Sequence, residues 1–99
     1  MTEIYRVADY VADYISDDDI KHVFLLPGGG NMHIVDAMGK CQGIDVVACL
    51  HEQAVSISAE AYSRINENIG VALVTSGPGA TNAITGVVGA WIESVPLII

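Results

Sequence analysis

The sequence predicts an α/β fold in which a parallel sheet of about four strands carries helices on both faces. Short apolar runs alternate with segments in which apolar residues recur every three or four positions, and Gly/Pro clusters follow the runs. Continuous apolar strands are typical of parallel sheets whose crossover helices cover both faces. The 99 residues suffice for one small domain or for part of one.

The first helix is predicted from about residue 3 to 15, with Thr2 as its cap. Its apolar face comprises Ile4, Val7, Ala8, Val11, Ala12 and Ile15. The acidic run 17–19 follows, where another helical turn would place like charges at the negative end of the dipole. We therefore predict a solvated turn there, and not a metal site, because consecutive side chains diverge.

A short buried strand is predicted over residues 22–26 (HVFLL), followed by a tight glycine-rich loop. Asn31 is expected to cap a short helix that runs to about Lys40. Val35 and Met38 form the predicted inner face of this helix.

A second strand, residues 45–50 (DVVACL), leads into a long helix from about 51 to 66. Two neighbouring rows of apolar residues predict a wide buried face on this helix. The rows are Ala54, Ile57, Ala61 and Ile65, and beside them Val55, Ala59 and Tyr62. Its many small side chains would let another backbone approach closely.

A third strand, residues 71–75 (VALVT), leads into SGPGATN, where the last helix is expected to begin. The apolar residues of that helix are Ala80, Ala83, Ile84, Val87, Val88, Trp91 and Ile92. Gly86 and Gly89 inside it cost about 1 kcal/mol each relative to Ala, so they predict close packing. Pro96 then breaks the chain, and PLII begins a fourth strand.

Composition narrows the classes of function. The chain is 52% hydrophobic and 16% charged, which predicts that much apolar surface meets another domain or subunit. A net charge of −8 argues against nucleic acid and against an acidic membrane surface. The chain shows neither a secretory leader nor a membrane-spanning run, so a cytoplasmic protein is expected. Cys41 and Cys49 have neither redox nor zinc spacing, and reduced structural thiols are expected.

The loops after the first three strands share one edge of a parallel sheet, where α/β proteins bind ligands. PGGGN, HEQ and SGPGATN are therefore placed to line one site. Each is weak alone, because PGGGN lacks both phosphate-loop spacings and is better explained as a plain turn. Glu52 alone would be a favourable first-turn charge. SGPGATN alone would be a strand-to-helix connection.

In combination these motifs are more specific. VFLLPGGGN, then HEQAVSISAEAYSR, then GVALVTSGPGATNAITGVVGAWIESVPLII resembles the N-terminal, pyrimidine-binding domain of thiamine-diphosphate-dependent enzymes. The similar group comprises acetolactate synthase, pyruvate oxidase and benzoylformate decarboxylase. The resemblance runs from about residue 4 to the end, and HEQ with TSGPGATN is its strongest part. It implies a thiamine-diphosphate-binding fold.

The resemblance implies that Glu52 is the catalytic carboxylate. In the family this residue bonds N1′ of the aminopyrimidine and promotes the 4′-imino form, which takes the proton from C2 of the thiazolium ring. Burial near an apolar interface is expected to raise its pKa. His51 is expected to point elsewhere, and His33 to lie on a helix surface.

The same motif matching implies two further groups of site residues. The residues expected to border the aminopyrimidine are Ser76, Gly77, Pro78, Gly79 and Asn82. The residues expected to face the substrate are Leu26, Pro27, Gly28 and Gly29. Leu26 stands where acetolactate synthases often carry Tyr, so the acceptor substrate is left open. No metal ligand is predicted.

The family's enzymes hold Mg²⁺ and the diphosphate on another domain through a GDG-to-Asn motif, which these 99 residues lack. Residues 1–99 are therefore expected to be a pyrimidine-binding domain truncated in its fourth strand, without the middle and diphosphate-binding domains, and inactive alone. Its implied partners are a diphosphate-binding domain of the same or a neighbouring subunit, in a homodimer or higher oligomer. FAD is left open.

The activity that the resemblance implies is that of a lyase or transferase. It would decarboxylate a 2-oxo acid such as pyruvate and transfer the acyl carbanion equivalent. The alternatives are a non-catalytic α/β module that binds a nucleotide-like ligand or serves only in assembly, and a degenerate remnant that still folds. A plain nucleotide module has no reason to carry HEQ and SGPGATN together.

Overall fold

The computed structural model describes residues 3–99, so the predicted cap Thr2 lies outside the described residues. Helices and strands alternate along the first three quarters of the chain, and two helices follow one another near its end. In chain order they are α1 (Val7–Asp17), β1 (His22–Leu25), α2 (Met32–Lys40), β2 (Asp45–Ala48), α3 (Glu52–Asn66), β3 (Gly70–Leu73), α4 (Pro78–Asn82), α5 (Ile84–Ile92) and β4 (Leu97–Ile98).

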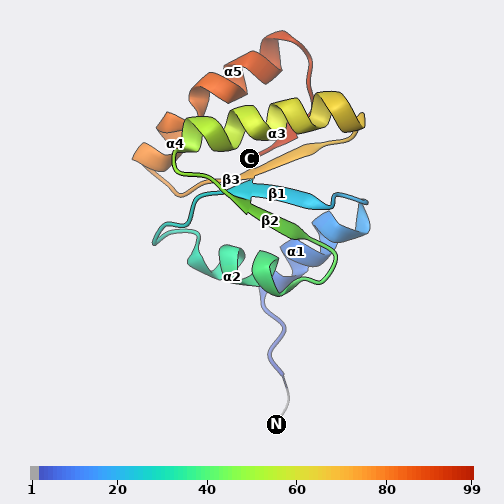
Figure 1. The fold of residues 1–99 in the computed structure, drawn as a ribbon. Helices are drawn as coiled ribbons and strands as arrows, with labels where there is room; N and C mark the ends of the chain where they lie inside the picture. The colour runs from blue at the N-terminus through green and yellow to red at the C-terminus, as the bar shows by residue number, and fades with distance from the viewer. Residues whose placement is uncertain (1–2) are drawn as a thin grey trace.

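The strands form a four-stranded sheet in the order β2-β1-β3-β4, with every neighbouring pair parallel. Phe24 on the central strand β1 pairs with Val47 on one side and with Ala72 on the other. Helices α1 and α2 cover one face of the sheet, and α3 and α5 lie on the other (Figure 1). The predicted α/β fold with a parallel sheet and helices on both faces is confirmed.

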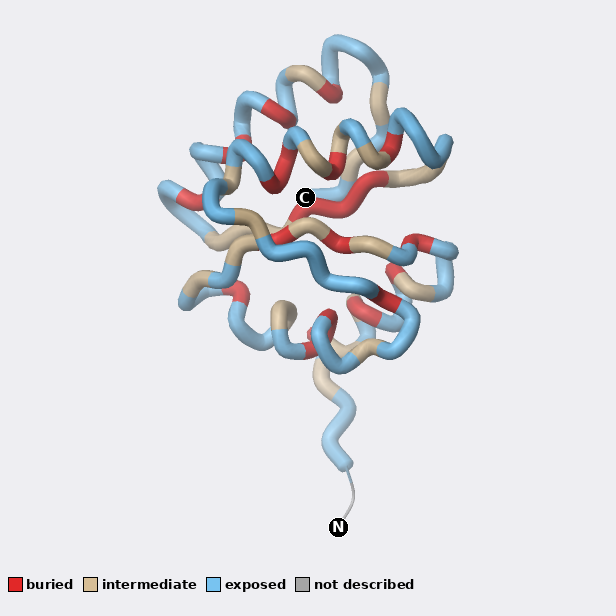
Figure 2. The backbone as a smooth tube through the Cα atoms, in the orientation of Figure 1, coloured by how far each residue is buried: buried red, intermediate tan, exposed pale blue. Residues whose placement is uncertain are grey.

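Two apolar clusters hold these layers together, one on each face of the sheet. Val23 and Leu25 of β1 lie in the cluster under α1 and α2, with Met38. Phe24 and Leu26 alternate to the other face, where they pack on Val55 and its neighbours in α3. Figure 2 shows buried residues along β1 and β3, whereas the edge strand β2 is exposed along its length.

Helix α1 begins later than predicted. Ile4 and Val7 are 82% and 81% exposed, so the first part of the predicted apolar face is not buried. Arg6 is extended at the helix N-cap, and its N–H donates to Asp9 Oδ2 at 2.8 Å. That bond starts the helix at residue 7 and leaves the preceding residues as an extended tail (Figure 1). The later face is buried as predicted, at Ala8, Ala12 and Ile15.

Helix α3 buries one of its two predicted rows. Val55 and Ala59 are buried against the sheet, whereas Ile57 and Ile65 of the other row are 42% and 82% exposed. In place of that row, α3 buries two serines, Ser56 and Ser63. Small side chains are needed on this helix because α5 packs against it. Ser56 lies against α5, and Ser63 Oγ donates to the Asn68 carbonyl at 2.6 Å.

The last predicted helix is two helices, α4 and α5, which meet at Ala83. Close packing is confirmed at Gly86, where an added Cβ would meet Ser56 Oγ and lie 2.6 Å from Ser56 Cβ. At Gly89 an added Cβ would lie 3.2 Å from Glu60 Oε2, the flexible end of a side chain. Helix α5 thus buries its small residues and exposes its large ones. The exposed large residues are Ile84, Val87, Val88, Trp91 and Ile92.

The acidic run after α1, the two cysteines and the helix lengths were also the subject of sequence predictions. Residues 17–19 are all exposed, but only residues 18 and 19 form the predicted turn, because α1 extends to Asp17. Cys41 and Cys49 carry free thiols. Between residues 3 and 99, no helix combines the length and the apolar character needed to cross a bilayer.

Candidate active site

Three loops meet at the edge of the sheet where β1, β2 and β3 end. Because these strands are parallel and adjacent, their carboxyl ends lie on one side. The loops are residues 26–31, residues 49–51 and residues 74–77. Direct contacts between loop 26–31 and Thr75, and between Glu52 and Gly79, join them into one site.

Glu52 is the first residue of α3 and is half-buried at this edge. His51 before it is extended, with φ −153° and ψ 144°, and its Nδ1 accepts from the Gln53 N–H at 3.0 Å. The His51 ring therefore caps α3. That it points away from the chemistry stays a prediction. His33 is exposed on α2, also as expected.

Asn82 orients the Glu52 carboxylate. Its Nδ2 donates to Glu52 Oε2 at 3.2 Å, across thirty positions of sequence. The pKa of Glu52 is lowered, chiefly by the hydrogen bond from its own backbone N–H and next by Asn82, while partial burial opposes the shift. The prediction of a raised pKa is wrong for this structure, because donors to the charged form outweigh desolvation.

The segment after β3 brings the predicted cofactor-binding residues together. Gly77 has φ +67° and forms the N-cap of α4, and Pro78 is the first residue of that helix. Gly79 is buried, and a Cβ added there would lie 3.4 Å from Glu52 Oε1. Gly79 and Asn82 thus approach the two oxygens of Glu52, whereas Ser76 and Pro78 are exposed beside them.

The predicted substrate-facing residues are divided between two environments. Leu26 donates its N–H to the Leu73 carbonyl at 3.2 Å, and its side chain packs in the cluster under α3. Pro27 and Gly29 are exposed at the edge of the site. A Cβ added at Gly28 would lie 2.6 Å from Thr75 Cβ, so Gly28 contacts the third loop.

The sequence analysis did not predict the roles of two residues at the site. Asn31 stands at the N-cap of α2, but its side chain serves the loop, because its Oδ1 accepts from the Gly28 N–H at 2.8 Å. An Asn placed three residues after a glycine in a turn is a signal that could have predicted this bond. Thr75 was assigned to a strand, and its contacts with Gly28 and Gly79 depend on the tertiary fold.

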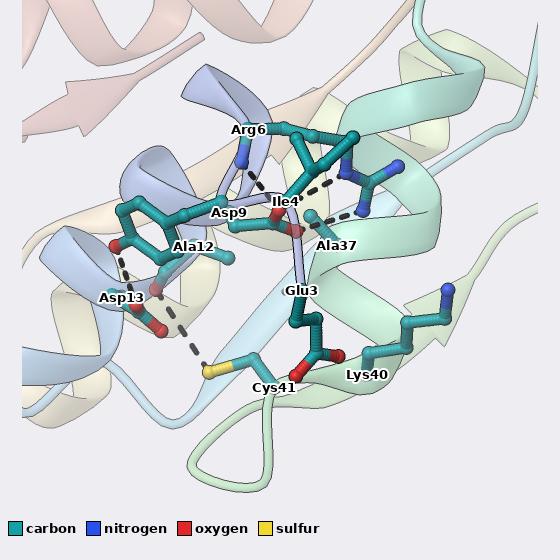
Figure 3. A pocket seen from close by; sticks show the side chains of 10 residues that line it. Glu3, Ile4, Arg6, Asp9, Ala12, Asp13, Ala37, Lys40 and Cys41 are labelled. Atoms are coloured by element: carbon teal, nitrogen blue, oxygen red, sulfur yellow. Dashed lines mark hydrogen bonds and ion pairs between the residues drawn. The ribbon is translucent and has the colours of Figure 1, made fainter. Parts of the chain in front are cut away.

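A hollow of about 520 Å³ lies away from this site, between α1, α2 and the extended tail (Figure 3). Hydrogen bonds tie its walls together: Arg6 Nη2 bonds Asp9 Oδ1 at 2.7 Å, and the Tyr5 hydroxyl donates to Asp13 at 2.6 Å. We regard it as a seam between two helices and not as the active site. Within residues 3–99, no three His, Cys, Asp or Glu side chains gather as a metal site would require.

A family match and the individual relatives both relate this chain to thiamine pyrophosphate enzymes. Residues 5–99 match the family described as thiamine pyrophosphate enzyme, N-terminal TPP binding domain. The chain is 44% identical over 97 residues to the acetolactate synthase large subunit of Buchnera aphidicola from Acyrthosiphon pisum, covering 98% of this chain and 17% of that protein. It is equally similar, over the same shares, to the acetolactate synthase isozyme 3 large subunit of Escherichia coli K12.

A more distant relative is the chloroplastic acetolactate synthase of Arabidopsis thaliana, 37% identical over 91 residues, or 92% of this chain and 14% of that protein. The chain thus spans about a sixth of the length of the curated relatives it matches. The matched family covers nearly every residue, and the parallel α/β sheet is consistent with its N-terminal domain. The chain belongs to the thiamine pyrophosphate enzyme family, as its N-terminal TPP-binding domain.

Proposed function

We propose that this chain is the pyrimidine-binding part of a longer thiamine-diphosphate-dependent enzyme of the acetolactate synthase type, with Glu52 as its cofactor-activating carboxylate. The observation that carries the proposal is the placement of Glu52. Its carboxylate lies at the start of α3 with Oε2 bonded to Asn82, and Gly79 approaches its other oxygen. This arrangement occurs in a chain whose family binds thiamine pyrophosphate at this domain.

The residues present fit the aminopyrimidine of the cofactor. Glu52 is half-buried at a glycine-lined edge, and Asn82 fixes the direction of its carboxylate. An oriented carboxylate can share a proton with a ring nitrogen, which is the role proposed for Glu52. When bound, thiamine diphosphate supplies the carbon that adds to a carbonyl and takes up the electron pair released by decarboxylation.

The proposed substrate is a 2-oxo acid such as pyruvate, whose acyl carbanion equivalent is passed to an acceptor. Support comes from the named relatives, which are acetolactate synthases. Residues 26–29 form the proposed substrate side, because this loop lies next to Thr75 at the same edge as Glu52. The acceptor is left open, because Leu26 stands where acetolactate synthases often carry Tyr. The Leu26 side chain is partly buried against the cluster under α3.

The proposed partner is a diphosphate-binding domain of the same or a neighbouring subunit, which would hold Mg²⁺, in a homodimer or larger assembly. Two observations support it. The chain spans 17% of its relatives' length, and α5 (ITGVVGAWI) has no charged side chain yet exposes its large residues. An apolar helix face of this kind is typical of a surface covered in an assembly. This chain alone is proposed to be inactive.

The test is a calorimetric titration of the native polypeptide that contains this chain with thiamine diphosphate and Mg²⁺. We expect Glu52→Gln to weaken binding at least about tenfold, the scale of one charge-assisted hydrogen bond. Glu67→Gln, at the opposite end of α3, is the matched control and should bind like the wild type.

A second ligand separates a specific bond from general damage. With an analogue that carries carbon in place of N1′, the wild type and Glu52→Gln should bind equally weakly. Wild-type protein that binds no cofactor would contradict the enzymatic proposal and favour a non-catalytic assembly module. Equal binding of thiamine diphosphate by the wild type and Glu52→Gln would remove the proposed role of Glu52.

A further inference from the structure

Thr75 lies where two of the site's loops meet. Its Oγ1 accepts a hydrogen bond from the Gly30 N–H at 3.2 Å. A Cβ added at Gly28 would lie 2.6 Å from both Cβ and Cγ2 of Thr75, and one added at Gly79 would lie 2.7 Å from Cγ2. Two of the glycines at this site are thus required by the Thr75 side chain, because neighbouring atoms do not approach a real Cβ that closely.

The glycine-rich loop is also held from its inner side. Asn31 is only 4% exposed, its Oδ1 accepts from the Gly28 N–H at 2.8 Å, and its Nδ2 donates to the Leu26 carbonyl at 3.3 Å. Among the described residues, none comes within 4 Å of a Cβ added at Gly29. The loop is therefore fixed at both ends and open at its middle, Gly29.

The two arms of the Thr75 side chain have different tasks. The hydroxyl bonds the loop 26–31 through Gly30. The methyl group lies between Gly28 of that loop and Gly79, whose own neighbour is Glu52 Oε1. A β-branched side chain has a restricted χ1 angle, so fixing one arm also fixes the other. One side chain thus links the loop 26–31 to the segment beside Glu52.

We propose that Thr75 is a positioning residue that sets the spacing between the loop 26–31 and the Glu52 side of the site. The inference rests on the proposed function, in which that loop faces the 2-oxo acid and Glu52 faces the cofactor. Thr75 then determines how the substrate is held relative to the cofactor, without touching either one.

The hydroxyl arm is tested by amide hydrogen exchange at Gly30 in the native polypeptide. Thr75→Val removes the acceptor and keeps the shape, whereas Thr75→Ser keeps the acceptor and removes the methyl group. We expect Gly30 to exchange about 2- to 12-fold faster in Thr75→Val, the range for one neutral hydrogen bond, and near the wild-type rate in Thr75→Ser. An unchanged rate in Thr75→Val would overturn the proposal.

The positioning role is tested by steady-state kinetics of the complete enzyme with pyruvate. Thr75→Val should raise KM about 2- to 12-fold and change kcat less, because the substrate-facing loop is loosened. Thr75→Ser, which keeps the hydroxyl, should have a KM near the wild-type value. This difference between the two variants would show that the effect of Thr75→Val is not a general loss of folded protein. Kinetic constants that stay at wild-type values while Gly30 exchanges faster would show that the loop contact does not position the substrate, and would overturn the proposal.

The methyl arm is tested by a double-mutant cycle read as thermal unfolding without cofactor. Gly79→Ala should lower the unfolding midpoint in the wild type and lower it less in the Thr75→Ser background. There Cγ2 is absent, and the nearest remaining atoms are Glu52 Oε1 at 3.4 Å and residue 75 Cβ at 3.6 Å. Equal losses in the two backgrounds would show that Thr75 does not require the glycine.

These readouts separate the inference from the proposed function. A wild-type protein that binds no thiamine diphosphate would contradict the proposed function. The exchange rate at Gly30 and the unfolding cycle, both measured without cofactor, would still decide whether Thr75 joins the loops.

Discussion

At the scale of single residues, the environment of Glu52 is polar and not apolar. Its own backbone N–H and Asn82 both donate to the carboxylate, and both lower its pKa. The sequence motif identifies Glu52 as the candidate but contains no information on these donors. Asn82 lies thirty positions away and reaches the carboxylate only through the fold.

Replacing Asn82 by Ala should therefore raise the pKa of Glu52. Asn82 stabilises the charged form, so its loss favours the protonated form. The rise should be partial, since the backbone N–H is the larger cause and remains. The measurement is an NMR titration of the Glu52 carboxyl carbon, with Asn66→Ala at the exposed end of α3 as the control. A Glu52 pKa unchanged by Asn82→Ala would contradict the assigned hydrogen bond.

At the scale of elements, the start of α1 depends on charge. Asp9 accepts from the Arg6 backbone N–H at 2.8 Å and from its guanidinium at 2.7 Å. The bonds with Arg6 lower the pKa of Asp9 from 3.8 to about 2. The sequence periodicity could not locate this boundary, because the helix begins where a side chain can bond an unsatisfied N–H.

The stability provided by Asp9 should depend on pH with a defined sign. Because its folded pKa lies below its unfolded value, the contribution is present above about pH 4 and is lost as the pH falls towards 2. Asp9→Asn should therefore lower the thermal unfolding midpoint at pH 6 and have little effect near pH 2. Asp17→Asn, at the exposed end of the same helix, is the control. An equal effect of Asp9→Asn at both pH values would contradict this ion pair.

The contact between α3 and α5 depends on Gly86. A Cβ added there would lie 2.6 Å from Ser56 Cβ and 2.7 Å from the Ser56 carbonyl carbon, which cannot move as a flexible side chain can. We expect Gly86→Ala to reduce the free energy of unfolding by about 1 to 3 kcal/mol through overpacking.

The matched control for that substitution is Gly39→Ala in α2, where no described atom lies within 4 Å of the added Cβ. Gly39→Ala should raise the free energy of unfolding by about 0.5 to 1 kcal/mol, because Ala has a higher helix propensity than Gly. Urea unfolding measures both variants. A Gly86→Ala variant as stable as Gly39→Ala would contradict the close packing of α3 on α5.

The elements also show what a sequence pattern can and cannot predict. The order of strands and helices follows from local periods and breakers, and it is confirmed by the parallel sheet. The burial of α3 does not follow in this way, since Val55 and Ile57 are equally apolar and only the neighbouring elements distinguish them. Likewise the spacing of Trp91 predicts a buried position on the last helix, yet Trp91 is 85% exposed on α5.

At the scale of the whole molecule, two observations support the proposal that a partner covers α5. Its large apolar residues are exposed, and the chain spans only about a sixth of the length of its relatives. We predict that Trp91→Glu in the complete enzyme weakens assembly at least about tenfold, because a charge would be buried in an apolar contact. Sedimentation velocity measures the change. Ser94→Asp, exposed just beyond the helix, is the control, and full assembly of Trp91→Glu would contradict a partner on this face.

Hydrogen–deuterium exchange at C2 of thiamine diphosphate, bound to the native polypeptide that contains this chain, tests the proposed role of Glu52 most directly. We predict that the wild type accelerates the exchange, that Glu52→Gln loses most of the acceleration, at least about 100-fold, and that Glu67→Gln retains it. Exchange that is equally fast in Glu52→Gln and in the wild type would contradict the role of Glu52 as the activating carboxylate.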